Sequence, residues 1–319
     1  MQSLRRAVID VGTNSVKLLV ADVAGREVRP LWEESKQTRL GQGFYETHRL
    51  QPAPIAKTAE AVAEFAAQAL QAQAESVRVI ATSAAREAVN ARELTSAIKQ
   101  ASGLAVEIIS GEQEADWAFQ GVTTDPRLAQ APLLLLEAGG GSTQLILGHG
   151  QQTDFRESYS LGTVRLLEQT RPGDPPRAEE LAACRGQVRE FLQKEVLPAL
   201  EPAMRRETKF LAHGGKAQLV GTGGTASILG CMEVELATFD RAKLDATRLS
   251  RQRLSWHVER LWGLPLEARK QLVGLPKNRA DVILTGAVIY EAVTQQCGFR
   301  ELRISTRGLR FGALLAGTA

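Results

Sequence analysis

The chain contains two glycine-rich turns, and each of them joins a pair of apolar, strand-like runs. DVGTNS at Asp10–Ser15 lies between AVI and VKLLVADV, and EAGGGSTQ at Glu137–Gln144 lies between LLLL and LILG. Glycine permits the tight backbone conformations in which several N–H groups converge on one anion. Because this strand–turn–strand pattern occurs twice, the sequence predicts an internal structural repeat, with one copy at the start of each of two domains and a phosphate channel held from both sides by the two turns.

The segments after each turn alternate between strand and helix patterns, which is typical of an α/β fold with a mixed sheet. A length of 319 residues suits two domains, and the proline-containing segment Thr123–Ala131 is the predicted first boundary. Strands are predicted at Arg5–Val11, Val16–Val23, Glu27–Glu34, Val77–Ala81, Ala105–Ile109, Leu133–Glu137, Gln144–Leu147, Thr153–Ser158, Gln218–Gly221 and Leu302–Ser305. Helices are predicted at Pro52–Gln73, Ala84–Asn90, Ala91–Ala101, Gly111–Val122, Arg177–Leu197 and Gly308–Leu315.

Composition argues against several classes of protein. Aromatic residues make up only 5% of the chain, too few for platforms that stack single-stranded nucleic acid, and the net charge of +3 is scattered. The three cysteines and four histidines form no CxxC, HxxxH or HExxH spacing, which argues against a disulfide framework and a zinc site. No apolar run is long enough to span a bilayer, and the first residues lack a signal-peptide pattern. We therefore expect a cytoplasmic protein that binds neither nucleic acid nor membranes.

Several polar residues near predicted strand ends could act on a bound phosphate. Asp10 ends a buried-looking strand, where a carboxylate is costly unless it meets a metal ion, a water molecule or a hydrogen-bond donor. Gly223 and Gly224 in GTGGTAS follow a strand and open a helix, whose free N–H groups can bind an anion or a nucleotide. Arg86 could bind a phosphate or be an ordinary solvated arginine. Glu114, at a helix start, could activate water or simply suit the helix dipole.

The motifs taken together resemble one family. AVIDVGTNSVKLLVAD, ATSAAREAVN, ISGEQEA, GGGST, SLGTVRL, LVGTGGT, RADVILTG and STRGLRFG occur in the order found in the exopolyphosphatase / guanosine pentaphosphate phosphatase (Ppx/GppA) family, and the match runs from about Arg5 to Phe311. The resemblance implies the actin-like ATPase superfold, with two ribonuclease-H-like domains and an interdomain cleft. The first domain would span residues 1–124 plus about 303–319, with the last helix crossing back to it, and the second would span residues 125–302.

The resemblance also implies an activity, the hydrolysis of a terminal phosphoanhydride bond of inorganic polyphosphate or guanosine pentaphosphate with the help of Mg²⁺ or Mn²⁺. Glu114 matches the family's catalytic glutamate, which would orient and deprotonate water, and Arg86 matches its phosphate-binding arginine. A homodimer is also expected. The two glycine turns match the family's phosphate loops, with Gly12, Thr13, Asn14 and Ser15 in the first and Gly139, Gly140, Gly141, Ser142 and Thr143 in the second.

Two side chains of the second turn depart from the family pattern. Glu137 replaces the aspartate expected to hold the metal, and Gln144 replaces a glutamate expected in the active site. Asp10 and Glu137 are the predicted metal ligands, and Gln144 could still orient water, as glutamine does in small GTPases. Two further departures, Gln113 for a glutamate and Phe311 for a glutamate, leave Glu114 in place.

Three functions follow from these residues. The leading hypothesis is an active, metal-dependent exopolyphosphatase. The second is a regulatory protein that binds polyphosphate or guanosine tetraphosphate, with catalysis weakened by Glu137 and Gln144. The third is an ATP-dependent kinase of the same superfold, against which the long run of family motifs argues.

Overall fold

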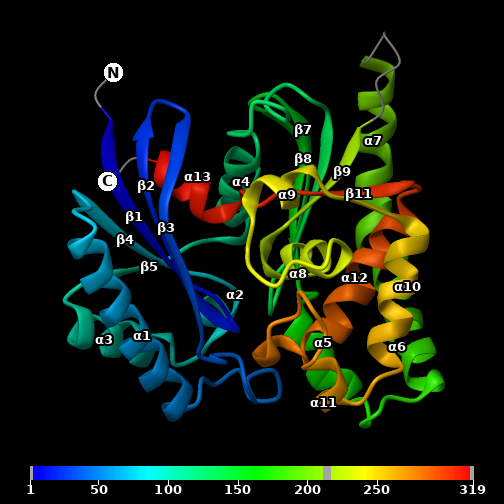
Figure 1. The fold of residues 1–319 in the computed structure, drawn as a ribbon, viewed down its shortest axis with the longest axis horizontal. Coiled ribbons are helices and arrows are strands. Elements are labelled where there is room, and N and C mark those ends of the chain that lie inside the picture. The colour runs from blue at the N-terminus through cyan, green and yellow to red at the C-terminus, as the bar shows by residue number, and fades with distance from the viewer. Residues whose placement is uncertain (1–2, 211–216, 317–319) are drawn as a thin grey trace. The chain divides into compact units, whose positions relative to one another are not determined.

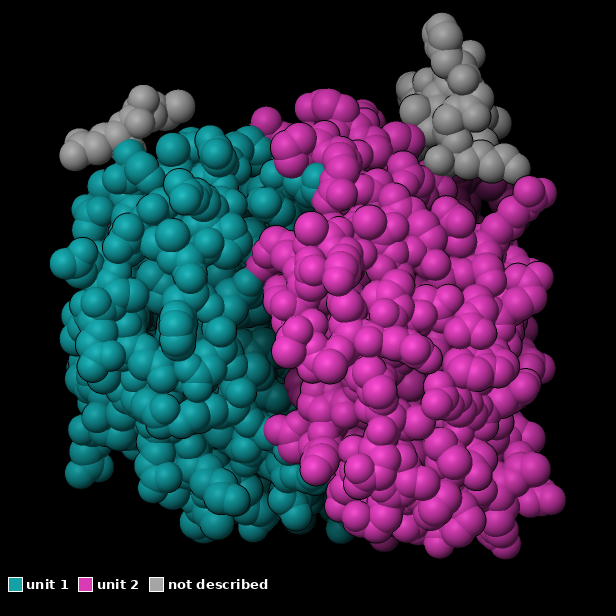
Figure 2. Space-filling view, in the orientation of Figure 1, with its two compact units in different colours: residues 1–125, 307–319 teal, residues 126–306 magenta. Residues whose placement is uncertain are grey.

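The computed structural model describes residues 3–210 and 217–316 and divides the chain into two compact units. Unit 1 comprises Met1–Asp125 and Arg307–Ala319, and unit 2 comprises Pro126–Thr306 (Figures 1 and 2). The chain returns to unit 1 at Arg307 rather than at about residue 303, because strand β11 (Glu301–Ile304) pairs with the sheet of unit 2.

Unit 1 is built on a five-stranded sheet in the order β3-β2-β1-β4-β5. Its strands are β1 (Leu4–Val11), β2 (Ser15–Ala24), β3 (Glu27–Gln37), β4 (Ser76–Ala81) and β5 (Val106–Ile108). The first three strands form an antiparallel meander, and β4 and β5 run parallel to β1. The parallel pairing places the carboxyl ends of β1, β4 and β5 at one end of the sheet, where α/β proteins bind their ligands.

Helices cover both faces of this sheet. Adjacent residues of β1 point to opposite faces, so Ile9 and Val8 belong to different core clusters. The covering helices are α1 (Pro52–Gln71) and α3 (Ala91–Ser102) on one face, and α4 (Gly111–Val122) and α13 (Leu309–Leu315) on the other (Figure 1). The short helix α2 (Ser83–Glu87) follows β4.

The last helix of the chain packs against α4 through glycine. A Cβ added at Gly312 would lie 1.9 Å from the carbonyl oxygen of Trp117, and one added at Gly121 would lie 2.0 Å from that of Gly308. Any larger residue at these positions would push the two helices apart. The helix that carries Glu114 is therefore positioned by residues almost two hundred positions further along the chain.

Unit 2 repeats the design of unit 1 on a six-stranded sheet in the order β10-β11-β9-β6-β7-β8. Its remaining strands are β6 (Leu133–Ala138), β7 (Thr143–His149), β8 (Gln152–Tyr159), β9 (Gln218–Thr222) and β10 (Arg248–Ser250). The order β8-β7-β6-β9 has the same antiparallel and parallel pairings as β3-β2-β1-β4. The predicted internal repeat is therefore confirmed.

The helices of unit 2 form one large core against this sheet. They are α5 (Thr163–Thr170), α6 (Ala178–Phe191), α7 (Leu197–Phe210), α8 (Gly223–Glu233), α9 (Arg241–Ala246), α10 (Arg251–Trp262), α11 (Leu266–Arg269) and α12 (Ile283–Gln296). The helix predicted over Arg177–Leu197 is longer, because a π-helical turn at Leu192–Val196 joins α6 directly to α7. Within residues 3–210 and 217–316, each helix is too short or too polar to cross a bilayer.

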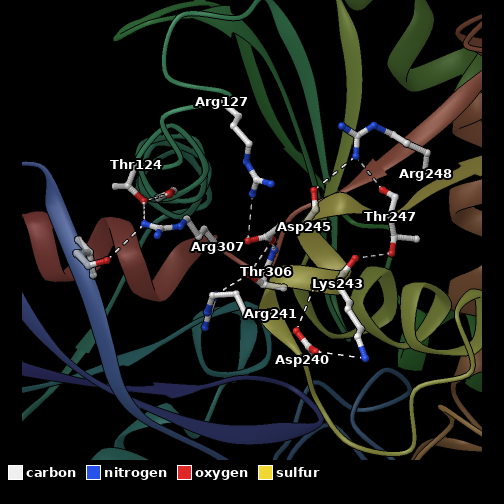
Figure 3. Close-up of polar contacts among 12 residues, drawn as sticks. Thr124, Arg127, Asp240, Arg241, Lys243, Asp245, Thr247, Arg248, Thr306 and Arg307 are labelled. Carbon is white, nitrogen blue, oxygen red and sulfur yellow. Dashed lines mark hydrogen bonds and ion pairs between the residues drawn. The ribbon is translucent and has the colours of Figure 1, made fainter.

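A buried carboxylate contacts residues near both the first and the last residue of unit 2. Asp245 at the end of α9 is 5% exposed, and its Oδ1 accepts hydrogen bonds from the backbone N–H and the hydroxyl of Thr306, both at 2.8 Å (Figure 3). Its Oδ2 lies 3.5 Å from Nη2 of Arg127. In unit 1, Arg307 donates to the hydroxyl of Thr124 at 2.8 Å. Each unit thus fixes both of the segments through which the chain enters and leaves it.

Candidate functional site

Carbonyl oxygens of the first glycine turn accept hydrogen bonds from neighbouring backbone N–H groups. Gly12 N donates to Ser15 O at 3.0 Å, and Gly41 N, in the loop after β3, donates to Thr13 O at 2.7 Å. Asn14 O accepts two further N–H groups of the same loop, at 3.1 and 3.2 Å. Because these acceptors are occupied, an anion that approaches the turn meets N–H and hydroxyl groups rather than repulsive carbonyl oxygens.

The second glycine turn is held in the same way by α5. Gly139 N donates to Ser142 O at 2.8 Å, and the first two N–H groups of α5 donate to Gly139 O and Gly140 O at 2.9 and 2.8 Å. Gly141 O accepts Nε of Arg165 at 2.9 Å. Three carbonyl oxygens of the turn are therefore bound by α5 and the fourth by Gly139 N, which leaves the other amide N–H groups of the turn for an anion.

Arg86 and Glu114 meet in unit 1 beyond the carboxyl ends of β4 and β5. Nη1 of Arg86 donates to Oε2 of Glu114 at 3.1 Å and to Ile109 O at 2.9 Å. The side chains are 24% and 10% exposed, respectively. Since both bonds use Nη1, the Nε and Nη2 edge of the guanidinium has the geometry to bind two oxygens of a phosphate.

Asp10 is the second acidic residue of the site in unit 1. It is 6% exposed, and its Oδ1 has no hydrogen-bond partner among the described residues. Burial raises the pKa of the carboxyl group, against the opposing effect of Lys17 and Arg310. A buried carboxylate oxygen without a donor is costly, so its retention at the end of β1 suits a ligand that is not part of the chain.

These residues fit a Mg²⁺ ion that is bound jointly by the protein and a phosphate ligand. Among residues 3–210 and 217–316, no group of three or more His, Cys, Asp or Glu side chains is arranged to hold a metal. Mg²⁺ needs no such group, because it is bound through one or two carboxylates, retained waters and the phosphates of its substrate. The unpartnered oxygen of Asp10 has the chemistry of one such carboxylate ligand.

Asp10→Asn is expected to make the apo-protein more stable while removing its response to Mg²⁺. Because the pKa of Asp10 is raised by folding, ionisation of its carboxyl group lowers the free energy of unfolding. Stability is therefore lost as the pH rises above the ordinary carboxyl pKa. A neutral asparagine side chain should restore that stability at pH 7. We expect a rise in melting temperature of roughly 2–4 °C in EDTA. Millimolar Mg²⁺ should stabilise the native chain and leave the variant unchanged.

Asp22→Asn is the matched control, because Asp22 lies on the next strand and accepts Nε of Arg5 at 2.9 Å. That variant should lower or preserve the melting temperature and keep the response to Mg²⁺. An Asp10→Asn protein that melts several degrees below the native chain in EDTA would contradict the assignment of Asp10 as an uncompensated carboxylate.

Glu137 and Gln144 face one another across β6 and β7, in register. Gln144 is 1% exposed, and its Nε2 donates to Oγ of Ser142 at 2.9 Å and to Oγ of Ser158 at 3.1 Å. The two departures from the family pattern are therefore cross-strand neighbours beside the glycine turn. In the structure the amide group of Gln144 is directed at two serine hydroxyls.

The amino terminus of α8 lies next to Glu137. A Cβ added at Gly223 would be 3.1 Å from Oε1 of Glu137, and one added at Gly224 would be 3.2 Å from Nη2 of Arg279. Because β6 and β9 are parallel neighbours, the glycine turn after β6 and the start of α8 after β9 lie at the same end of the sheet. Unit 2 thus brings together the residues predicted from EAGGGSTQ and GTGGTAS.

Three residues that support unit 2's site were not identified from the sequence. Arg165 holds Gly141 O, and Arg279 lies against Gly224. The hydroxyl of buried Tyr290 donates to Thr222 O at 2.7 Å at the end of β9. Arg165 and Arg279 lie in the family motifs SLGTVRL and RADVILTG, and these motifs are the sequence signal that could have identified them. The role of Tyr290 has no such signal, because it depends on a contact with a residue 68 positions away.

Several known proteins are similar to this chain. The Ppx/GppA phosphatase family matches residues 19–317. Exopolyphosphatase 2 of Mycobacterium tuberculosis is 34% identical over 331 aligned positions, which cover 99% of both chains. A guanosine-5'-triphosphate,3'-diphosphate pyrophosphatase of Photobacterium profundum is 31% identical over 98% of this chain and 58% of its own length. A solved Ppx/GppA enzyme of Aquifex aeolicus is 28% identical, with a TM-score of 0.77 and coverage of 99% and 100%.

Proposed function

Because this chain belongs to the Ppx/GppA phosphatase family, we propose that it is an exopolyphosphatase, which removes the terminal phosphate of inorganic polyphosphate. It is a phosphoanhydride hydrolase with the actin-like ATPase superfold, and each unit has a ribonuclease-H-like sheet. The observation that carries the proposal is the common construction of the two glycine turns, whose carbonyl oxygens are bound away from an incoming anion. A chain of phosphates is a substrate that such turns suit.

In this proposal Glu114 and Arg86 act on the terminal phosphate. Glu114 orients a water molecule and takes its proton as the water attacks phosphorus. Arg86, fixed through Nη1 by Glu114 and Ile109 O, offers its remaining N–H groups to the phosphoryl oxygens as their charge spreads. Mg²⁺ or Mn²⁺ would neutralise charge on the phosphates when bound, and the carboxylate of Asp10 would be one of its ligands.

The second candidate is a polyphosphate- or guanosine tetraphosphate-binding regulator, which the position of Gln144 favours. Its amide is directed at Ser142 and Ser158, and a neutral amide attracts a cation less strongly than the family's carboxylate would. Guanosine pentaphosphate is the alternative substrate, since one similar protein is a pyrophosphatase of guanosine-5'-triphosphate,3'-diphosphate.

One assay separates these functions. Orthophosphate release is measured side by side from short polyphosphate, long polyphosphate and guanosine pentaphosphate, with Mg²⁺, with Mn²⁺ and in EDTA. We expect metal-dependent release from polyphosphate. Release from guanosine pentaphosphate alone would reassign the substrate, and binding without release from any of the three would favour the regulator.

A further inference from the structure

The side-chain amide of Gln144 determines the direction of the hydrogen bonds beside the second turn. An amide nitrogen has two N–H donors and no acceptor, and those of Gln144 are directed at the oxygens of Ser142 and Ser158. A serine hydroxyl has one proton, which it can turn toward an acceptor elsewhere. Since each serine oxygen receives an N–H, its own proton is not needed by Gln144 and stays available to a ligand.

A glutamate at this position would reverse that direction. A carboxylate only accepts hydrogen bonds, so both serine hydroxyls would turn their protons toward it and expose lone pairs to the ligand. Lone pairs suit a metal ion or its waters, whereas protons suit the oxygens of a phosphate. A carboxylate at residue 144 would also stand opposite Glu137, its register partner, and the pair would repel an anion.

Ser142 connects this pattern to the turn itself. Its backbone oxygen closes the turn by accepting Gly139 N at 2.8 Å, and its hydroxyl belongs to a residue that is 4% exposed. A Ser142 hydroxyl proton directed at the ligand would add to the amide N–H groups of the turn. All of these groups can donate a hydrogen bond to a phosphate oxygen.

We propose that Gln144 is a positioning residue that fixes Ser142 and Ser158 as hydrogen-bond donors and makes the second turn an anion subsite for a phosphate without a divalent cation. The inference rests on the proposed function in that it takes a phosphate as the occupant of the turn.

The test is the affinity for inorganic tripolyphosphate, measured by calorimetry in EDTA and in Mg²⁺. Gln144→Glu should weaken binding about tenfold or more in EDTA, and Mg²⁺ should restore most of that loss. Ser142→Ala should weaken binding by the native chain about tenfold, the effect of one hydrogen bond to a charged group. The same substitution should change nothing in the Gln144→Glu background, because the Ser142 proton is then directed at the carboxylate.

Two controls separate donor direction from charge and from folding. Gln187→Glu adds the same charge at an exposed position of α6 and should leave the affinity unchanged. Gln144→Met removes the amide donors without adding charge, so the serine protons are no longer fixed toward the ligand, and the affinity should fall measurably but less than in Gln144→Glu. Melting temperatures establish that each variant is folded at the temperature of the titration.

The inference fails if the native chain and Gln144→Glu bind tripolyphosphate equally well in EDTA. It also fails if Ser142→Ala lowers the affinity by the same factor in the native and the Gln144→Glu backgrounds. It also fails if the native chain binds tripolyphosphate only when Mg²⁺ is present, although metal-dependent hydrolysis would then still stand. Conversely, the predicted binding pattern without phosphate release from polyphosphate would overturn the proposed exopolyphosphatase and leave the anion subsite supported.

Discussion

Glu114→Gln is expected to lower the rate of orthophosphate release from polyphosphate by about 10²–10⁴-fold, the usual contribution of a general base. Glutamine keeps the shape of the side chain and retains an oxygen that can accept Nη1 of Arg86, which now lies 3.1 Å from the carboxylate. The variant loses only the ability to take a proton. Its affinity for polyphosphate should therefore stay within a few-fold of the native value.

The matched control for this experiment is Glu112→Gln, on the same first turn of α4. Glu112 is exposed, whereas Glu114 is buried and paired with Arg86. Both substitutions remove one negative charge near the helix amino terminus, so a general electrostatic effect would appear in both. Equal losses of activity in the two variants, or native activity in Glu114→Gln, would show that the general base is another residue.

The sequence was sufficient to predict features that depend on local backbone chemistry. Strand ends can be located from apolar runs, and glycine with small polar residues after them indicates a turn, so the positions of Gly12–Ser15 and Gly139–Thr143 followed directly. Arg86 and Glu114 were assigned through their family motifs. Their contact follows from the parallel pairing of β4 with β5, which brings the helices after both strands to one end of the sheet.

Side-chain direction and long-range support could not be predicted in this way. The sequence shows that Gln144 replaces a carboxylate, but its donors are directed by Ser158, which is a neighbour only through the register of β7 with β8. The return to unit 1 at Arg307 likewise depends on pairing of β11 within unit 2. Such contacts depend on tertiary arrangement, and local residue patterns carry no information about them.

Gly162→Ala is expected to lower the rate of phosphate release by about 100-fold, although Gly162 is outside the glycine turn. Gly162 precedes α5 with φ of −142°, an extended conformation that alanine also adopts, so the substitution causes no backbone strain. Its added Cβ, however, would lie 2.4 Å from both Gly140 O and Gly141 C. Backbone atoms cannot yield as a flexible side chain does, so the turn must move, and a displacement of about 1 Å can cost about 100-fold in rate.

Gly186→Ala provides the matched control, because it makes the same chemical change in α6, where an added Cβ meets nothing within 4 Å. Alanine is favoured over glycine in an exposed helix, so this variant should gain up to about 1 kcal/mol of stability and keep native activity. In Gly162→Ala, tripolyphosphate affinity and rate should fall together, since the displaced turn would lose hydrogen bonds to the bound substrate as well as to the transition state. Native kinetics in this variant would mean that α5 does not set the position of the turn, and that the hydrogen bonds from α5 to the carbonyl oxygens of Gly139 and Gly140 stabilise the fold without shaping the site.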